Sequence, residues 1–133
     1  MNLGLKGKIV VVTGAAGLKG SIGETIIHAL ANEGAIPIIV CRNDRGYKYE
    51  KKLQNEGVET TFIKTDLSNT NQIKKTSKII GEKYGKIDVL INNVGINDGV
   101  GLEASIDDFM HSLQLNMVSY FAMTKYCLPY IKK

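Results

Sequence analysis

The sequence is poor in the residue types that build metal centres and disulfide frameworks. Its 133 residues include only two cysteines, Cys41 and Cys127, and two histidines, His28 and His111. Neither pair has the short spacing of metal ligands, so we expect no metal site. The chain also lacks the run of roughly 18 to 20 apolar residues that a membrane span needs, and residues 1–6 lack the apolar core of a signal peptide. These absences predict a cytoplasmic location and no membrane partner.

The charge distribution argues against a nucleic-acid partner. The formal net charge is +4, with 23% charged and 44% apolar residues. The lysines are scattered in pairs such as Lys51-Lys52, Lys74-Lys75 and Lys132-Lys133, and do not form one basic stripe with interleaved aromatic residues. We therefore expect one domain over residues 1–133, with its own core and solvated helix faces.

Short apolar runs alternate along the chain with longer segments of helical periodicity. This order predicts strands at residues 9–13, 36–40, 60–64 and 87–92, and helices at residues 22–32, 46–56 and 69–84. Continuous apolar strands indicate a parallel sheet that is covered by helices on both faces. The predicted fold class is α/β, a Rossmann-type doubly wound parallel sheet that is truncated after the helix following the fourth strand.

Several helix boundaries carry their own signals. Gly34 follows the first helix as a C-cap, Ser68 precedes the third as an N-cap, and Gly85 ends the third. Residues 105–131 predict one long helix that Ser105 and Asp108 open as a capping box. Its apolar positions at helical spacing are Ile106, Phe109, Met110, Leu113, Met117, Tyr120 and Phe121.

A glycine-rich loop, residues 13–23, joins the first strand to the first helix. Glycines permit a tight turn and close backbone approach, and the helix N-terminus offers amide donors to a pyrophosphate. Glycine also suits any turn that requires a positive φ, but a strand before the loop and a helix after it favour dinucleotide binding. The candidate contacts are Gly14, Gly17, Lys19, Gly20, Ser21 and Ile22.

Polar residues end the fourth predicted strand. Asn92, Asn93 and Gly95 follow its apolar run, and ligands bind at the carboxyl ends of strands in open α/β sheets. Asn and Gly are also common turn formers, so an ordinary turn is the alternative interpretation.

These motifs, with Leu5-x-Gly7-Lys8, Asp66-Leu67 and Asn116 in the long helix, resemble the short-chain dehydrogenase/reductase family along the whole chain. The resemblance implies the NAD(P)-binding part of an oxidoreductase that moves a hydride between a nicotinamide dinucleotide and a hydroxyl or carbonyl substrate. It further implies that Asp66, next to Leu67, holds the adenine, that the Asn92 to Gly95 stretch lines the adenosine side, and that Asn116 supports the catalytic proton relay. The usual Asn-Asn-Ala-Gly reads Asn-Asn-Val-Gly here.

The glycine spacing allows two alignments with that family. In one, Ser21-Ile22-Gly23 closes the motif after three inserted residues. In the other, Gly14, Gly17 and Gly20 are the motif, as in sugar-nucleotide-modifying relatives. Either alignment retains the cofactor.

The residues after the second strand favour NADP over NAD. NAD enzymes place an acidic side chain there to accept the ribose hydroxyls, whereas this chain has Arg42, which suits a 2′-phosphate. The resemblance adds Lys19, because a basic residue before a loop glycine often accompanies NADP preference. NAD remains the second choice, since Arg42 could be a solvated charge and Asp44 could turn towards a ribose.

Residues 97–103 and 34–37 are similar to L-fucose dehydrogenase-type members, which implies a sugar or other small alcohol as substrate, although such polar segments are also typical of plain loops. The family's catalytic Ser and Tyr-xxx-Lys are not found before Lys133. Tyr47 and Lys51 have the spacing, but they follow the second strand and we interpret the pair as chance.

Two functions remain open at this point: part of an oxidoreductase that is a homo-oligomer when complete, or a non-catalytic NADP-binding module or decayed gene product. In either case residues 89–91 would form an uncovered edge strand, and the 109–121 face would lack partners.

Overall fold

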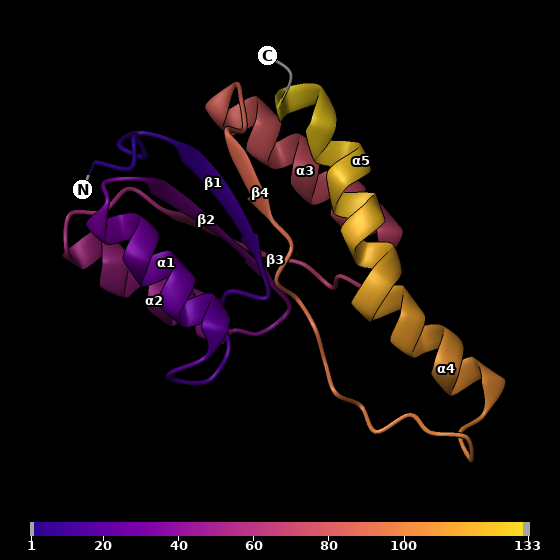
Figure 1. Ribbon diagram of the computed structural model, residues 1–133. Coiled ribbons are helices and arrows are strands. Elements are labelled where there is room, and N and C mark those ends of the chain that lie inside the picture. The colour runs from indigo at the N-terminus through magenta and orange to yellow at the C-terminus, as the bar shows by residue number, and fades with distance from the viewer. Residues whose placement is uncertain (1, 132–133) are drawn as a thin grey trace.

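The computed structural model describes residues 2–131. It is a parallel four-stranded sheet of order β3-β2-β1-β4, with α1 and α2 on one face and α3 and α5 on the other (Figure 1). The chain pairs β1 with β2 and β2 with β3, and then returns to place β4 on the free side of β1. The predicted fold class is therefore confirmed. The elements are β1 Ile9–Thr13, α1 Ile22–Asn32, β2 Ile36–Cys41, α2 Arg45–Asn55, β3 Thr61–Lys64, α3 Thr70–Tyr84, β4 Val89–Ile91, α4 Ile106–Leu113, η1 Gln114–Val118 and α5 Ser119–Ile131.

The strands are apolar throughout because each is buried on both faces. Side chains alternate across the sheet, so Val10 and Val12 of β1 belong to the cluster under α1 and α2, and Val11 belongs to the cluster under α3 and α5. Ile27 and Leu53 close the first layer, and Ile73, Ile80 and Met123 close the second. These two layers fix the positions of the loops at the carboxyl ends of the strands.

One predicted helix cap is wrong. Asn69 caps α3, because its side chain accepts the N–H of Gln72 at 3.1 Å. Ser68 instead donates its hydroxyl and its N–H to the Asp66 carboxylate, at 2.7 and 2.9 Å. Gly85 ends α3 with a φ of 74°, as expected. The residue after α1 is Glu33, and Gly34 follows it with a φ of 75°.

The fourth strand is shorter than predicted. Ile87 donates its N–H to the carbonyl of Tyr130 at 3.2 Å, and the Asp88 carboxylate accepts the N–H of Ile9 at 2.8 Å. The Asp88 N–H also donates to the carbonyl of Ile9 at 2.9 Å. Asp88 thus still binds β1, but the paired register of β4 with β1 begins at Val89. β4 is an edge strand of this sheet, as expected, and Val89 is 37% exposed.

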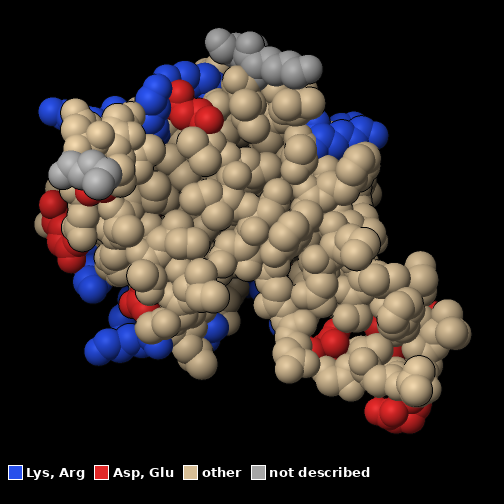
Figure 2. Space-filling model, viewed as in Figure 1, with Lys and Arg blue, Asp and Glu red and all other residues tan. Residues whose placement is uncertain are grey.

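The long helix runs from Ile106 to Ile131, but a π-helical turn, η1, interrupts the predicted α-helix. Ser105 caps it by accepting the N–H of Asp108 at 3.0 Å. The broad surface over β4 and α5 is almost free of charged side chains, and acidic side chains appear at the α4 end (Figure 2). Its exposed apolar side chains include Ile106, Phe109, Met110, Met117 and Phe121.

Candidate functional site

The first glycine of the loop lies where β1 and β4 end side by side. Gly14 has a φ of 65°, and a Cβ there would lie 2.7 Å from the Cα of Val94. Its N–H donates to the carbonyl of Val40 on β2 at 2.8 Å. Only glycine combines this φ with so close an approach. The backbone of the loop is therefore not covered by a side chain of residue 14 at the point where the strand order reverses.

A second close contact joins the first helix to the same point. A Cβ on Gly23 would lie 2.5 Å from the Gly14 carbonyl and 2.8 Å from the Cα of Ala15. Gly23 is therefore the glycine that packs helix against strand, a role that the last glycine has in dinucleotide-binding motifs. This favours the alignment in which Ser21-Ile22-Gly23 closes the motif after three inserted residues, 18–20.

Thr13 and Asn93 tie the ends of β1 and β4 together. The Thr13 hydroxyl accepts the N–H groups of Asn93 and Val94, at 2.9 and 3.1 Å. In return the Asn93 amide donates to the carbonyls of Thr13 and Gly14, at 3.1 and 3.2 Å. The Asn93 side chain thus binds the backbone of the glycine turn. All four hydrogen bonds lie in part-buried positions.

A cavity of about 240 Å³ opens at the carboxyl ends of the strands. Five predicted contacts line it, namely Gly14, Gly17, Arg42, Leu67 and Gly95. The cavity therefore lies at the switch point between β1 and β4, where doubly wound sheets bind ligands. Its other lining residues are Ala16, Cys41, Asn43, Arg45, Val94, Ile96 and Leu115.

Asp66 lies beside this cavity and does not line it. The hydrogen bond from the Ser68 hydroxyl, with further help from the Ser68 N–H, lowers the pKa of the Asp66 carboxyl against the cost of partial burial. The positive charges of Arg42 and His111 act in the same direction. Asp66 is thus an anion that fixes the turn carrying Leu67, which is 3% exposed.

The end of β2 presents two arginines and a neutral thiol to the cavity. Burial raises the pKa of the Cys41 thiol, so this position carries no charge at neutral pH. Arg42 is exposed, and the Arg45 Nε donates to the carbonyl of Ala16 at 3.3 Å. Asp44 lines no part of the cavity, because it is 2.8 Å from the Lys64 Nζ on β3.

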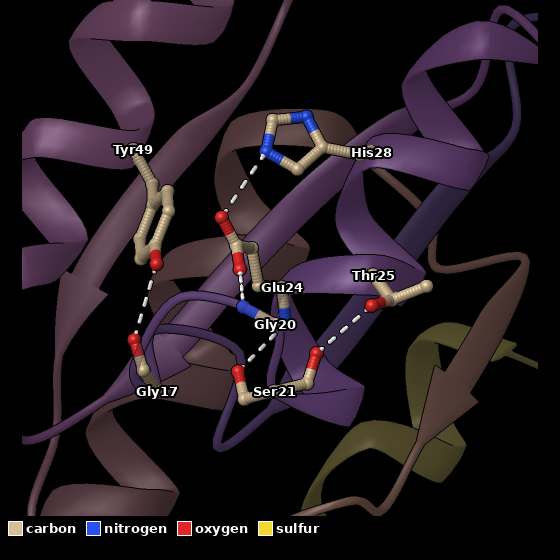
Figure 3. Close-up of polar contacts among 7 residues, drawn as sticks. All are labelled: Gly17, Gly20, Ser21, Glu24, Thr25, His28 and Tyr49. Atoms are coloured by element: carbon tan, nitrogen blue, oxygen red, sulfur yellow. Dashed lines mark hydrogen bonds and ion pairs between the residues drawn. The ribbon is translucent and has the colours of Figure 1, made fainter.

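The loop at residues 17–20 is held by side chains of α1 and α2 (Figure 3). The Tyr49 hydroxyl of α2 donates to the carbonyl of Gly17 at 3.1 Å, and the Glu24 carboxylate accepts the N–H of Gly20. The other Glu24 oxygen lies 3.9 Å from the His28 Nε2. Lys19 and Gly20 are exposed and away from the cavity.

Ser21 and Ile22 form the start of α1 and also do not line the cavity. The Ser21 Oγ accepts the N–H of Glu24 at 3.3 Å, which makes Ser21 the N-cap, and Ile22 is the first helical residue. Backbone N–H groups in the first turn of a helix have no acceptor within the helix, and they are the donors that an anion would use.

Asn116 lies at the centre of the π-helical turn. Its side-chain oxygen accepts the N–H of Ile96 at 2.8 Å, and its amide donates to the Ser112 hydroxyl at 3.3 Å. The Tyr120 hydroxyl donates to the carbonyl of Val94 at 2.7 Å. The long helix therefore holds the segment after β4, and π-helical turns often occur at functional positions.

Asn92 faces α5, away from the cavity. Its amide donates to the Thr124 hydroxyl at 3.3 Å, and its side-chain oxygen is buried without a hydrogen-bond partner among the described residues.

Sequence reasoning missed Thr13, Arg45 and Tyr49 as parts of the site. Thr13 had a local signal, since it is a polar residue at the end of an apolar strand. Arg45 and Tyr49 lie one turn apart on α2, but nothing local shows which face of a helix meets the glycine loop. In residues 2–131 no cluster of His, Cys, Asp and Glu could hold a metal ion, and no helix is long and apolar enough to cross a membrane.

Comparison with protein families matches residues 8–133 to the short chain dehydrogenase family. The chain belongs to this family. An uncharacterized oxidoreductase of Thermotoga maritima is 30% identical over 126 residues, which are 92% of this chain and 48% of that protein. The chain thus spans about half the length of the curated relatives it matches.

Solved structures of a dehydrogenase and a reductase show the same architecture. The crystal structure of Cj0485 dehydrogenase superimposes with a TM-score of 0.89 at 38% identity, over 99% of this chain and 50% of that one. The NADH-dependent reductase A1-R′, complexed with NAD, gives a TM-score of 0.84 at 30% identity, over 98% of this chain and 54% of that one. The resemblance to this family seen in the sequence is therefore confirmed.

Proposed function

We propose that this chain is the cofactor-binding part of an NADP-dependent oxidoreductase that acts on a hydroxyl or carbonyl group of a small molecule. The observation that carries the proposal is the cavity at the strand ends, beside the bare backbone of Gly14. A Cβ would fill the space at Gly14 and Gly23, and such glycine positions let a pyrophosphate approach the backbone closely. A nicotinamide dinucleotide, when bound, supplies the hydride acceptor or donor.

Different residues of this chain would bind different parts of the dinucleotide. The first turn of α1, capped by Ser21, offers backbone donors to the pyrophosphate. Leu67 and Gly95 line the end of the cavity that we assign to adenine and its ribose. Asp66 holds the Leu67 turn in place, and its charged carboxylate remains available to accept from the adenine amino group.

Three features support NADP over NAD. The thiol of Cys41 stands at the end of β2, where NAD-binding domains carry an acid, and burial keeps it neutral. Arg42 and Arg45 give this side of the cavity positive charge, and arginine matches phosphate geometry. The Lys64 contact holds Asp44 away from the cavity.

We further propose that Asn116 is a positioning residue for the proton relay. Its hydrogen bond to Ile96 fixes the segment that leaves the cavity. The π-helical turn, in which Asn116 is the central residue, positions its side chain for this bond. The substrate that we propose is a sugar or another small polyol, since residues 97–103 carry the polar side chains of Asn97, Asp98 and Glu103, which could bind hydroxyl groups.

Calorimetric titration of the purified protein with NADP and, separately, with NAD tests the cofactor proposal. We expect NADP to bind about tenfold more tightly, because one charge-assisted hydrogen bond is worth about 1.5–3 kcal/mol. Arg42→Asp should reverse this preference, whereas Lys75→Asp on α3, a charge reversal on the other face of the sheet, should not. If the Arg42 variant and the parent protein bound each cofactor equally tightly, the charge argument would be refuted.

A further inference from the structure

The three inserted residues of the glycine loop, 18–20, form a tight turn (the inserted turn). The Ser21 N–H donates to the carbonyl of Leu18 at 2.9 Å, which closes the turn over Lys19 and Gly20. Gly20 has a φ of 83°, the region that the third residue of a type II turn occupies. A Cβ at Gly20 would meet none of the described residues within 4 Å apart from its chain neighbours. The φ of the turn, and not a close contact, therefore accounts for the glycine.

The inserted turn changes how α1 is capped. Ser21 and Glu24 have the spacing of a capping box, in which the glutamate side chain accepts the N–H of the N-cap residue itself. Ser21 does accept the Glu24 N–H, at 3.3 Å. The N–H of Ser21, however, binds Leu18, and the Glu24 carboxylate accepts the N–H of Gly20 instead (Figure 3). The return bond of the capping box is thus shifted by one residue and holds the inserted turn.

Two backbone donors stay free at the start of α1. The N–H groups of Gly20, Ser21 and Glu24 are all engaged, whereas those of Ile22 and Gly23 have no acceptor among residues 2–131. Adjacent free N–H groups at a helix N-terminus suit the oxygens of a pyrophosphate. Because the inserted turn directly precedes these donors, its position affects how they are presented.

The charge of Glu24 and its hydrogen bond have opposite effects on anion binding. A negative charge in the first turn stabilises the helix through the helix dipole, but it repels an anion that approaches the same N–H groups. The hydrogen bond to Gly20 orders the backbone that leads to those groups. The two effects can therefore be separated by substitutions that remove the charge with or without the acceptor.

A contact from α2 supports the other end of the inserted turn. The Tyr49 hydroxyl donates to the carbonyl of Gly17 at 3.1 Å. Burial, together with the negative charge of Glu24, raises the pKa of Tyr49, so the hydroxyl remains a donor at neutral pH. The His28 ring lies edge-on to the Tyr49 ring at 6.4 Å, and its Nε2 is 3.9 Å from Glu24. The inserted turn is thus fixed at both ends, by Glu24 and by Tyr49.

We propose that Glu24 is a positioning residue for the dinucleotide. As a hydrogen-bond acceptor it orders the inserted turn and so presents the free N–H groups of Ile22 and Gly23 to the pyrophosphate. Ordering loop backbone costs conformational entropy, and a turn that is already ordered in the free protein removes this cost from binding. The inference rests on the proposed function, because it adds a residue to the same site.

The test compares three variants of the full chain. Glu24→Ala removes both the acceptor and the charge, whereas Glu24→Gln removes the charge and keeps an acceptor oxygen. Glu33→Ala removes an exposed carboxylate at the other end of α1 and is the control for net charge. The heteronuclear ¹⁵N NOE values of Lys19 and Gly20 report the order of the inserted turn in the free protein. Calorimetry reports the affinity for NADP, and circular dichroism checks that each variant is folded.

We expect Glu24→Ala to lower these NOE values and to bind NADP about tenfold more weakly, through the loss of one charge-assisted hydrogen bond. Glu24→Gln should retain the NOE values and bind NADP at least as tightly as the parent, because the repulsive charge is gone. Glu33→Ala should change the affinity by less than about twofold, since charges this far apart are screened by salt.

Three results would overturn the proposal: unchanged NOE values in Glu24→Ala, NADP binding by Glu24→Ala that is as tight as that of the parent or tighter, or equal weakening by the two Glu24 variants. Failure of the parent protein itself to bind NADP would instead contradict the proposed function. In that case the NOE values would still decide whether Glu24 orders the inserted turn.

Discussion

Adding one methyl group at Gly23 should separate the first helix from the sheet. The new Cβ would lie 2.5 Å from the Gly14 carbonyl, 2.8 Å from the Ala15 Cα and 2.9 Å from the Asn93 Nδ2. Two of these atoms are backbone and the third holds the glycine turn, so none can move cheaply. Overpacking of this kind costs about 1–3 kcal/mol, and alanine in a helix recovers up to about 1 kcal/mol relative to glycine.

We therefore expect Gly23→Ala to lower the free energy of unfolding by about 1–2 kcal/mol, measured by urea denaturation. It should also weaken dinucleotide binding, since the Gly14 carbonyl must shift. Ala29→Gly, at an exposed position of the same helix, is the control because it measures the intrinsic difference between the two residues in α1. If Gly23→Ala stabilised the protein by about the amount that Ala29→Gly destabilises it, the close approach of α1 to β1 would be refuted.

Three further perturbations follow from the same structure. Thr13→Val removes the acceptor of two part-buried N–H groups and should lower the free energy of unfolding by about 1–3 kcal/mol. Thr13→Ser keeps the hydroxyl and should retain most of the stability. Equal urea midpoints for the two variants would contradict the role of the hydroxyl as acceptor. The pKa of Asp66 is lowered in the folded state. The stabilisation that Asp66 contributes is therefore present above its unfolded pKa of about 3.9 and is lost as the pH falls through its folded pKa. Ser68→Ala should raise the folded pKa of Asp66 in a carbon-detected NMR titration, and an unchanged value would show that Ser68 is not the cause. Phe121 is 69% exposed, so Phe121→Ser should reduce self-association of this chain in sedimentation velocity with little change in unfolding; unchanged association would exclude this face.

The fold was predictable because its signals are local. The apolar run of β1, the glycines after it and Gly85 at the end of α3 each specify their own geometry. The cap of α3 shows the limit, since Ser68 and Asn69 are both good caps. Ser68 bonds to Asp66, two residues before it, and Asn69 is left as the cap. The start of β4, in contrast, depends on contacts of Ile87 and Asp88 with residues distant in sequence, Tyr130 and Ile9.

The site was predictable only in part for a similar reason. Gly14 and Gly95 line the cavity because strand ends meet at one edge of a parallel sheet, which sequence order already implies. The roles of Arg45 and Tyr49 depend on how α2 is rotated over the sheet, and the burial of Leu53 and Gly46 sets that rotation. Lys19, which the resemblance implies at the cofactor, does not line this cavity.

A nicotinamide dinucleotide should bind in the cavity at the strand ends. Amide chemical-shift mapping of the isotope-labelled protein with NADP tests this most directly. We expect large shifts for Gly14, Gly17, Leu67 and Gly95, and small ones for Gly57 and Val58 at the opposite end of the sheet. Shifts that gather at that opposite end, or none with millimolar NADP, would contradict it.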